Sequence, residues 1–299
     1  MNIAVTGAGG FLGSAVVPAL ARKGATVHAI LGPGDTATPA AAAVSRLEIR
    51  DQSALRTALT GAEVVVHLAG PASVAASFLE PLLYLQVHAE GTAALLEACR
   101  AAGVSRVVHV SSAEVYGRPL RNPVDEDHPL SARSPYAAAK IAAEKLIEAA
   151  TYAHGLSAAV LRPFSIYGPG ASKDSLIPRI IGQALERKPE VMLRDLRPIR
   201  DYCYVTDLAE AAAAACQLKE GGFVVFNIGT GVGTSVAQVA ELILQGSSRL
   251  VESRDKDRPG SSEILELVAD NRRAREKLRW VPAVSLKDGL RLTLAGFGQ

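Results

Sequence analysis

A phenol and an ammonium group lie four residues apart in the sequence, at Tyr136 and Lys140. In a helix this spacing puts both side chains on one face. A phenol has an unperturbed pKa of about 10, so it is a poor base at neutral pH unless a nearby cation favours the phenolate. Lys140 can supply that positive charge. The pair therefore has the groups needed to take a proton from a substrate hydroxyl.

Two more hydroxyl groups, Ser111 and Ser112, follow an apolar run that ends at Val110. If that run is a buried parallel strand, the serines emerge at its carboxyl end, where ligands bind on such sheets. The Ser112 hydroxyl can then hold a substrate oxygen in line while the phenolate takes its proton and a hydride leaves the same carbon. Ser112, Tyr136 and Lys140 are the predicted catalytic set.

A glycine-rich turn follows the first apolar run and leads into a predicted helix. Its glycines, Gly7, Gly10 and Gly13, allow a tight turn and a close approach of the backbone to a pyrophosphate. The helix N-terminus adds N–H donors and partial positive charge. After the first strand of an α/β chain, this pattern predicts a dinucleotide site, and a nicotinamide is the expected hydride acceptor.

The residues leave open which nicotinamide dinucleotide binds. An NAD site usually has an acid at the end of the second strand, whereas an NADP site has a basic group nearby. Here the second strand, Thr26 to Leu31, ends in leucine. Asp35 in the following loop could reach back to the ribose or lie in solvent. NAD is the expected cofactor, and NADP is not excluded.

Short apolar runs alternate with helix-like segments and must position these groups. The runs are Ile3 to Thr6, Thr26 to Leu31, Val44 to Ile49, Val64 to Leu68, Val107 to Val110 and Ala158 to Leu161. Because they are continuous rather than alternating in polarity, they predict strands buried on both faces, in a doubly wound parallel sheet of α/β class. The fold expected is a Rossmann sheet with a smaller C-terminal α/β lobe.

The alternation becomes irregular after about Tyr167. We therefore expect a nicotinamide-binding Rossmann domain over residues 1–167. Residues 168–299 are expected to form mainly a substrate-binding lobe, with some segments returning to the main sheet. Helix-like stretches in this part lie near Ser175 to Arg187, Asp207 to Leu218, Ser235 to Leu244 and Asn271 to Leu278.

The composition, with 48% apolar and 21% charged residues, is typical of a globular protein with a large core. A formal charge of +2 with interspersed signs offers no broad basic face for nucleic acid or an anionic membrane. Apolar stretches fall short of the ~20 residues of a bilayer span, and the N-terminus lacks a signal-peptide pattern. A cytoplasmic protein is expected. The three cysteines predict no metal site, since none lies near a histidine at metal-ligand spacing.

The order and spacing of several motifs resemble the extended short-chain dehydrogenases, and within them the sugar-nucleotide epimerases, dehydratases and ketoreductases. The resemblance spans nearly the whole chain. Besides the Gly7 turn and the Tyr136/Lys140 pair, the matching segments are Val66 to Gly70, Ser111 to Gly117, Leu161 to Gly170, Arg200 to Asp207, Phe226 to Gly231 and Trp280 to Pro282.

The resemblance implies roles for particular residues. It identifies Ser112, Tyr136 and Lys140 as catalytic, and a nucleoside-diphosphate sugar as the substrate. Substrate contacts are implied for Ser112, Glu114, Ser165, Arg200 and Arg258. Cofactor contacts are implied for Gly7, Gly10, Phe11, Leu12, Gly13, Glu48, Ile49, Leu68, Ala69, Tyr136 and Lys140. A homodimer through the helices near Pro81 to Ala102 and Tyr136 to Tyr152 is also implied.

The chain departs from the family pattern at positions that bear on the reaction. His88 stands where an asparagine is common, and so does Ser165. Ala113-Glu114 stands where 4,6-dehydratases have an acidic pair, so the proton donor for a departing hydroxyl is missing. Transient oxidation at the sugar ring by a 4-epimerase is the leading prediction. A 4-keto-6-deoxysugar ketoreductase is the runner-up, followed by a dehydratase and a non-catalytic nicotinamide-binding protein.

Overall fold

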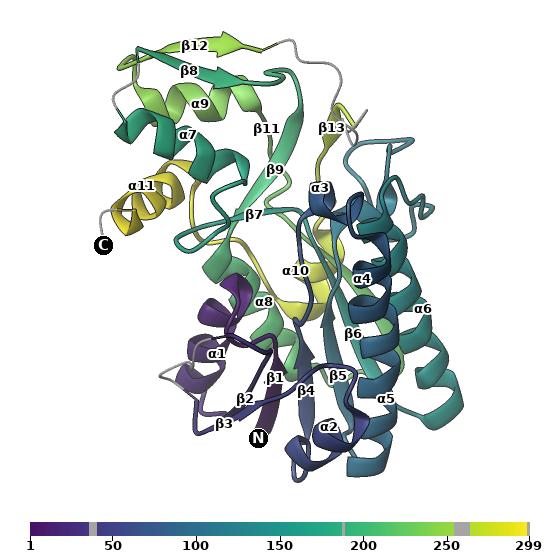
Figure 1. Ribbon diagram of the computed structural model, residues 1–299. Helices are drawn as coiled ribbons and strands as arrows, with labels where there is room; N and C mark the ends of the chain where they lie inside the picture. Colours follow the sequence, from purple (N-terminus) through teal and green to yellow (C-terminus); the bar gives the residue numbers. More distant parts are fainter. Residues whose placement is uncertain (36–40, 187–188, 254–263, 298–299) are drawn as a thin grey trace.

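The computed structural model describes residues 1–35, 41–186, 189–253 and 264–297. Within these residues, a parallel sheet of seven strands has the order β10-β6-β5-β4-β1-β2-β3 (Figure 1). Its strands are β1 Asn2–Thr6, β2 Thr26–Leu31, β3 Ala43–Arg46, β4 Val64–His67, β5 Arg106–Val110, β6 Ser157–Pro163 and β10 Phe223–Ile228. The strand order reverses between β1 and β4, where doubly wound sheets bind ligands. The predicted Rossmann sheet is confirmed.

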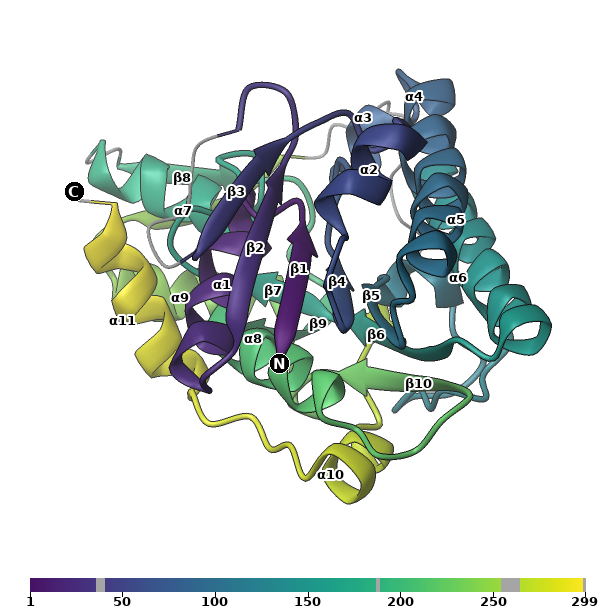
Figure 2. The ribbon, with the colours of Figure 1, turned by 90° about the horizontal axis from the view of Figure 1, so that it is seen from below.

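Helices cover both faces of this sheet (Figure 2). One face packs against α1 Phe11–Arg22 and α8 Val205–Cys216, and the other against α2 Gln52–Ala58, α5 Gly91–Ala102 and α6 Pro135–His154. Side chains alternate across a strand, so Ile3 and Val5 enter the first core cluster while Ala4 enters the second. Burial on both faces explains why the strand sequences are continuously apolar.

The predicted strand Val44 to Ile49 differs from the observed one. In the structure β3 ends at Arg46, and Val44 is 47% exposed. The reason is that β3 is the edge strand and pairs only with β2. Ile49 lies beyond the strand and is buried in the core beside α2.

A smaller lobe begins after β6 and lies at the upper left of Figure 1. Its strands are β7 Ser165–Tyr167, β9 Ile199–Tyr204, β11 Gly233–Ser235 and β13 Glu266–Leu267, with a separate pair formed by β8 Glu190–Leu193 and β12 Arg249–Glu252. Its helices are α7 Leu176–Leu185, α9 Val236–Leu244 and α11 Leu286–Gly296. Their apolar faces share one core cluster, and Phe11 and Leu12 of α1 pack against it.

Segments after residue 168 also return to the large sheet. Strand β10 pairs with β6, and α8 packs against α1, while α10 Arg272–Leu278 lies beside β10 and α8. The indole of Trp280 donates a hydrogen bond to the Asp207 carbonyl at 2.8 Å, which fastens the segment after α10 to α8. The two parts therefore interlock along the chain.

Short helices connect β4 to α5. They are α3 Val74–Ser77, α4 Pro81–Leu85 and a π-helical turn Gln86–Glu90, and a 3-10 turn Ala113–Tyr116 follows β5. In the part of the chain that the structure describes, no helix combines the length and apolar character that a bilayer crossing requires.

Gly13 sets how closely α1 packs against the turn that precedes it. A Cβ at this position would overlap the Ala8 carbonyl oxygen, which is backbone and cannot move aside. We therefore expect Gly13→Ala to lower the free energy of unfolding by about 1–3 kcal/mol, measured by chemical denaturation. Gly182 in α7 is the matched control, because its Cβ would meet no atom within 4 Å. Gly182→Ala should be neutral or stabilising by up to about 1 kcal/mol; equal losses in both variants would rule out the packing explanation.

Candidate active site

The glycine-rich turn forms a cradle at the carboxyl end of β1. Gly7 has a φ of +68°, and a Cβ there would come within 2.7 Å of the Ala69 backbone nitrogen. Gly10 precedes α1 and donates its N–H to the Gly7 carbonyl at 3.1 Å. Glycines thus let two backbone segments approach each other at a helix N-terminus. These features fit the pyrophosphate of a dinucleotide.

A cavity of about 180 Å³ continues from this turn along the ends of β1 and β2. It is lined by Thr6, Gly7, Leu31, Asp35, Glu48, Ile49, Ala69 and Gly70, among others. Asp35 accepts a hydrogen bond from the Gly32 N–H at 2.8 Å, so its carboxylate is turned back toward the end of β2. Leu68 and Ala69 come directly after β4, and their backbone lies against Gly7 of the glycine-rich turn. The structure therefore gathers residues implied for the adenosine end around one cavity.

Tyr136 and Lys140 stand on successive turns at the start of α6. The helix begins after Ser134, whose hydroxyl accepts the Ala137 N–H at 3.1 Å, and Pro135 occupies the first helical position. Lys140 Nζ donates to the Val110 carbonyl at 2.8 Å and lies 5.9 Å from the centroid of the Tyr136 ring. The helix thus carries both groups to the carboxyl end of β5.

Ser112 joins these two groups from the strand side. Its Oγ accepts the Glu114 N–H at 3.1 Å, and its side chain hydrogen-bonds the Tyr136 phenol. The three predicted catalytic side chains therefore lie together, and all three are buried. Phe11 and Leu12, by contrast, line the helix start and contact the smaller lobe.

Burial controls the protonation of the pair. It raises the pKa of Tyr136 to about 12, although the Ser112 hydrogen bond opposes this shift. Burial lowers the pKa of Lys140 to about 8, while the nearby Glu144 carboxylate acts in the opposite sense. In the protein alone, the Tyr136 phenol therefore stays protonated at neutral pH, and in that form it cannot take a proton from a substrate. Positive charge beside it is needed to favour the phenolate.

Behind Lys140 lies a buried ion pair that the sequence interpretation missed. Arg162 of β6 donates to Glu144 of α6 through Nη2 at 2.6 Å and through Nε at 3.1 Å, and Ser111 donates to the same carboxylate at 2.5 Å. Burial by itself would lower the pKa of Arg162, but the hydrogen bonds to Glu144 and the charge of that carboxylate outweigh it, so the pKa is raised. A glutamate four residues after Lys140 was the available signal, because it must share the lysine's helix face.

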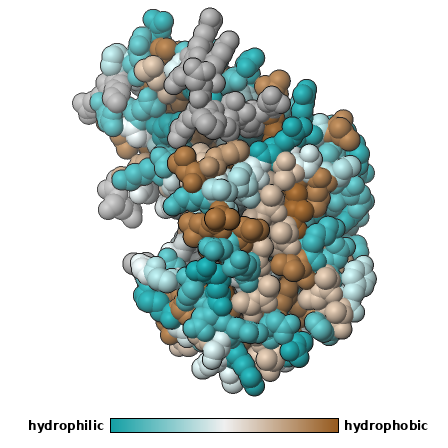
Figure 3. All heavy atoms as spheres, turned by 45° about the vertical axis from the view of Figure 1, so that its right-hand side comes forward, coloured by the Kyte–Doolittle hydropathy of each residue, from teal (hydrophilic) through white to brown (hydrophobic). Residues whose placement is uncertain are grey.

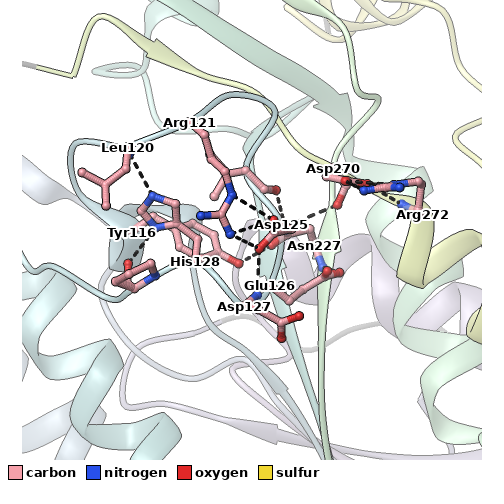
Figure 4. A network of polar contacts seen from close by, with 12 residues as sticks. Tyr116, Leu120, Arg121, Asp125, Glu126, Asp127, His128, Asn227, Asp270 and Arg272 are labelled. Atoms are coloured by element: carbon pink, nitrogen blue, oxygen red, sulfur yellow. Dashed lines mark hydrogen bonds and ion pairs between the residues drawn. The ribbon is translucent and has the colours of Figure 1, made fainter.

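The same arginine anchors the loop that follows Ser112. Arg162 donates to the Tyr116 hydroxyl at 3.0 Å, and Tyr116 donates to Asn227 of β10 at 2.6 Å. Asn227 in turn donates its backbone N–H to Glu126 at 2.8 Å. Figure 4 shows Tyr116, Asn227 and Glu126 within this network, together with His128 and the Arg121–Asp125 ion pair. These hydrogen bonds hold the loop at several points, so the backbone that carries Ser112 and Glu114 is fixed in position.

The smaller lobe brings Arg200 toward Glu114. Arg200 of β9 donates to the carbonyls of Ile199 and Ile264, each at 2.9 Å. Its charge opposes the rise in the pKa of Glu114 that burial causes. Ser165 of β7 pairs in register with Tyr202 of β9, two residues beyond Arg200, and is half-buried. Arg258 lies outside the described residues.

The model of the NAD dependent epimerase/dehydratase family matches residues 3–229. UDP-glucose 4-epimerase of Mycolicibacterium smegmatis is 34% identical over 313 residues, covering 99% of this chain and 98% of that protein. dTDP-glucose 4,6-dehydratase of Streptomyces griseus is 32% identical over 315 residues, covering 99% and 94% respectively.

A solved structure shows the same similarity. UDP-glucose 4-epimerase from Thermotoga maritima, with UDP-glucose, superimposes with a TM-score of 0.88 at 31% identity, covering 100% of this chain and 99% of that one. Together with the Rossmann sheet, these matches show that the chain belongs to the NAD dependent epimerase/dehydratase family, as an enzyme of the extended short-chain dehydrogenase type in its UDP-glucose 4-epimerase-like group.

Proposed function

We propose that the protein is a nucleotide-sugar 4-epimerase that transiently oxidises the sugar ring. The observation that carries this proposal is the convergence of Ser112, Tyr136 and Lys140 at the carboxyl end of β5, beside the glycine cradle. A bound nicotinamide supplies the hydride acceptor there. The similarity to UDP-glucose 4-epimerases along almost the whole chain supports the choice of substrate class.

In this mechanism Tyr136 takes the proton from the sugar hydroxyl, and Ser112 holds that oxygen by a hydrogen bond. Because burial raises the pKa of the phenol to about 12, the step depends on positive charge near it. Lys140 supplies part of that charge from one helical turn away, and its bond to the Val110 carbonyl keeps the ammonium in place. In the proposed reaction the oxidised sugar would turn over before the hydride is returned, so the hydride would add to the other face of the same ring carbon while Tyr136 returns the proton to the sugar oxygen.

A dehydratase is disfavoured by the turn that follows Ser112. Ala113 occupies the first position of this 3-10 turn and is buried, so no carboxylate can act from there. Glu114 is the next residue, and its electrostatic partner is Arg200. A single carboxylate beside an arginine lacks the separate acid and base that elimination of water requires.

NAD is the proposed cofactor, because an acidic group lies where the adenosine ribose would be recognised. Leu31 ends β2, but Asp35 lines the same cavity and is held by the Gly32 N–H. A carboxylate there can accept a ribose hydroxyl and would repel the 2′-phosphate of NADP. The NAD dependence of the family agrees with this choice.

The proposed reaction can be tested with the purified protein, UDP-glucose and UDP-galactose. We expect interconversion of the two sugars without net consumption of added cofactor, and mass spectrometry should identify any copurifying nucleotide as NAD. Tyr136→Phe should lose at least about 10²-fold in turnover while binding NAD normally, because only the proton-transferring hydroxyl is removed. Net reduction driven by NADPH would instead indicate a ketoreductase, and an active Phe variant would exclude the phenol as the base.

Arg200 is proposed to bind the substrate diphosphate, since a near-neutral protein must meet such an anion with local cations. Arg200→Ala should weaken competitive inhibition by UDP about 10- to 100-fold relative to wild type. The inhibition of Arg200→Lys should lie between that of wild type and that of Arg200→Ala, because lysine restores the charge without a bidentate contact. Arg197, an exposed arginine paired with Asp195, is the control, and Arg197→Ala should bind UDP like wild type. Unchanged UDP inhibition of the Arg200→Ala variant would exclude the diphosphate contact.

A homodimer through the helices near Pro81 to Ala102 and Tyr136 to Tyr152, which include α4 and α6, is also proposed. Leu82 of α4 is 71% exposed and Tyr152 of α6 is 81% exposed, and Leu79, Leu83, Leu85 and Leu146 are also exposed. Figure 3 brings this side of the molecule forward and shows apolar side chains gathered on it. Contiguous exposed apolar groups on paired helices are typical of an interface.

The double variant Leu82→Glu/Tyr152→Glu should convert a dimer into a monomer, because it places two charges in each copy of the buried contact. Light scattering during size-exclusion chromatography measures the change. Leu120 is equally exposed but lies in the loop after β5, so Leu120→Glu should leave the mass unchanged. A monomeric wild type would reject the interface.

A further inference from the structure

A row of buried polar side chains crosses the sheet just beneath the cofactor cradle. Thr6, His67 and His109 are in-register neighbours on β1, β4 and β5. Each lies two residues after a side chain of the α5/α6 core (Ala4, Val65 and Val107), so all three point to that face. His88 of the π-helical turn is buried near this row and next to Tyr136. The proposed mechanism uses none of these histidines.

The hydrogen-bond directions around His67 follow from the donors available. The Thr92 hydroxyl donates to the His88 carbonyl at 2.5 Å, so toward His67 Nε2, at 3.1 Å, it can only accept. His67 therefore carries its proton on Nε2, and its Nδ1 accepts from the Thr6 hydroxyl at 2.7 Å. Thr6 Oγ1 in turn accepts the Ala69 N–H at 3.4 Å. This directed chain ties the segment after β4 to α5.

His88 makes a second tie to the same segment. Its Nε2 lies 2.9 Å from the Pro71 carbonyl, which can only accept, so Nε2 carries the proton. Burial and the charge of Lys140 lower the pKa of His88 to about 2, so the ring is neutral. The ring also lies against Gly70, where a Cβ would overlap it. Both contacts fall on the segment Leu68 to Pro71, part of which lines the adenosine cavity.

The same ring also contacts the proposed proton acceptor. The His88 and Tyr136 rings lie edge to face, with centroids 5.6 Å apart and an interplanar angle of 75°. Tyr84 of α4 contacts both rings, with its centroid 6.1 Å from that of Tyr136 and 6.0 Å from that of His88. Edge-to-face contacts of this kind favour particular ring orientations. One imidazole therefore touches both the cofactor-side segment and the catalytic phenol.

We infer that His88 is a positioning residue that fixes the Leu68–Pro71 segment for the dinucleotide and orients Tyr136, through its hydrogen bond to Pro71 and its ring contact with the phenol. The inference rests on the proposed function, in which that segment binds the cofactor and Tyr136 moves the proton. A neutral ring suits this position, since a second cation beside Lys140 would be poorly solvated. His88 itself exchanges no proton with the substrate.

The test uses variants that separate the donor from the ring. His88→Phe keeps an aromatic ring without a donor, and His88→Gln keeps a donor that can reach the Pro71 carbonyl. Calorimetry of NAD binding without sugar should show about tenfold weaker binding for His88→Phe, the value of one hydrogen bond, and near-wild-type binding for His88→Gln. At saturating NAD, turnover should remain lower in His88→Gln than in wild type, because the ring against Tyr136 is gone.

His109→Leu is the matched control. His109 is as buried as His88, and neither of its ring nitrogens has a hydrogen-bond partner within the described residues. Replacing it should therefore leave NAD affinity unchanged. If His88→Phe does not fold, His88→Asn replaces it, because its shorter amide cannot reach Pro71 and the same loss of affinity is expected.

Two results would overturn the inference. One is wild-type NAD affinity in the donor-less His88 variant, and the other is an equal loss of affinity in His109→Leu, which would make the effect a general one of the buried row. Because binding is measured without sugar, a wild type that binds NAD but converts no UDP-sugar would refute the epimerase proposal alone. A wild type that binds no NAD would overturn both.

Discussion

The ion pair between Arg162 and Glu144 lies beneath the carboxyl edge of the sheet, with both side chains at most 5% exposed. Charges buried this deeply are tolerated only when paired and hydrogen-bonded, and removing one partner leaves the other uncompensated. Here the carboxylate has two bonds from the guanidinium and one from Ser111. The pair therefore fixes α6 relative to β5 and β6. Since α6 carries Tyr136 and Lys140 while β5 leads into Ser112, the geometry of the proposed catalytic set depends on this ion pair.

The polar groups nearer the glycine-rich turn follow a different rule. Burial lowers the pKa of His67 to about 3 and that of His88 to about 2, and the charge of Lys140 acts in the same direction. Both rings are therefore neutral hydrogen-bonding groups. The site keeps its positive charge at Lys140, where it can favour the phenolate, while uncharged imidazoles hold the backbone around it. Neutral groups cost less to bury than additional ions.

The smaller lobe is joined to the sheet by a buried carboxylate on the strand that carries Arg200. Asp201 accepts hydrogen bonds from the Thr230 N–H at 2.7 Å, the Gly231 N–H at 2.8 Å and the Ala269 N–H at 3.2 Å. These donors follow β10 and β13. Since neighbouring side chains on a strand point to opposite faces, anchoring Asp201 also determines the direction in which Arg200 leaves β9. The approach of Arg200 to Glu114 is thus a property of the whole lobe.

Local sequence determined the elements and the motifs within them. The Gly7 turn, the continuous apolar strands and the four-residue spacing of Tyr136 and Lys140 depend on backbone geometry over a few residues. They could therefore be predicted, and together with the motif order they indicated the family. The helices predicted in the second half agree with α7, α8, α9 and α10 to within a few residues. Boundaries depended on tertiary context, as the early end of β3 at the sheet edge shows.

Only the tertiary structure decided how distant residues meet. Glu144 finds Arg162 from another element, His88 reaches back to Pro71, and Glu114 faces Arg200 from the other lobe. Asp35 likewise lines the cavity that continues from the glycine-rich turn, which its position in a loop did not decide. No periodicity or spacing encodes such pairs, because they arise when the sheet, its helices and the smaller lobe pack together. The protonation states of the site could not be predicted from the sequence either, since the pKa values depend on burial by the assembled fold.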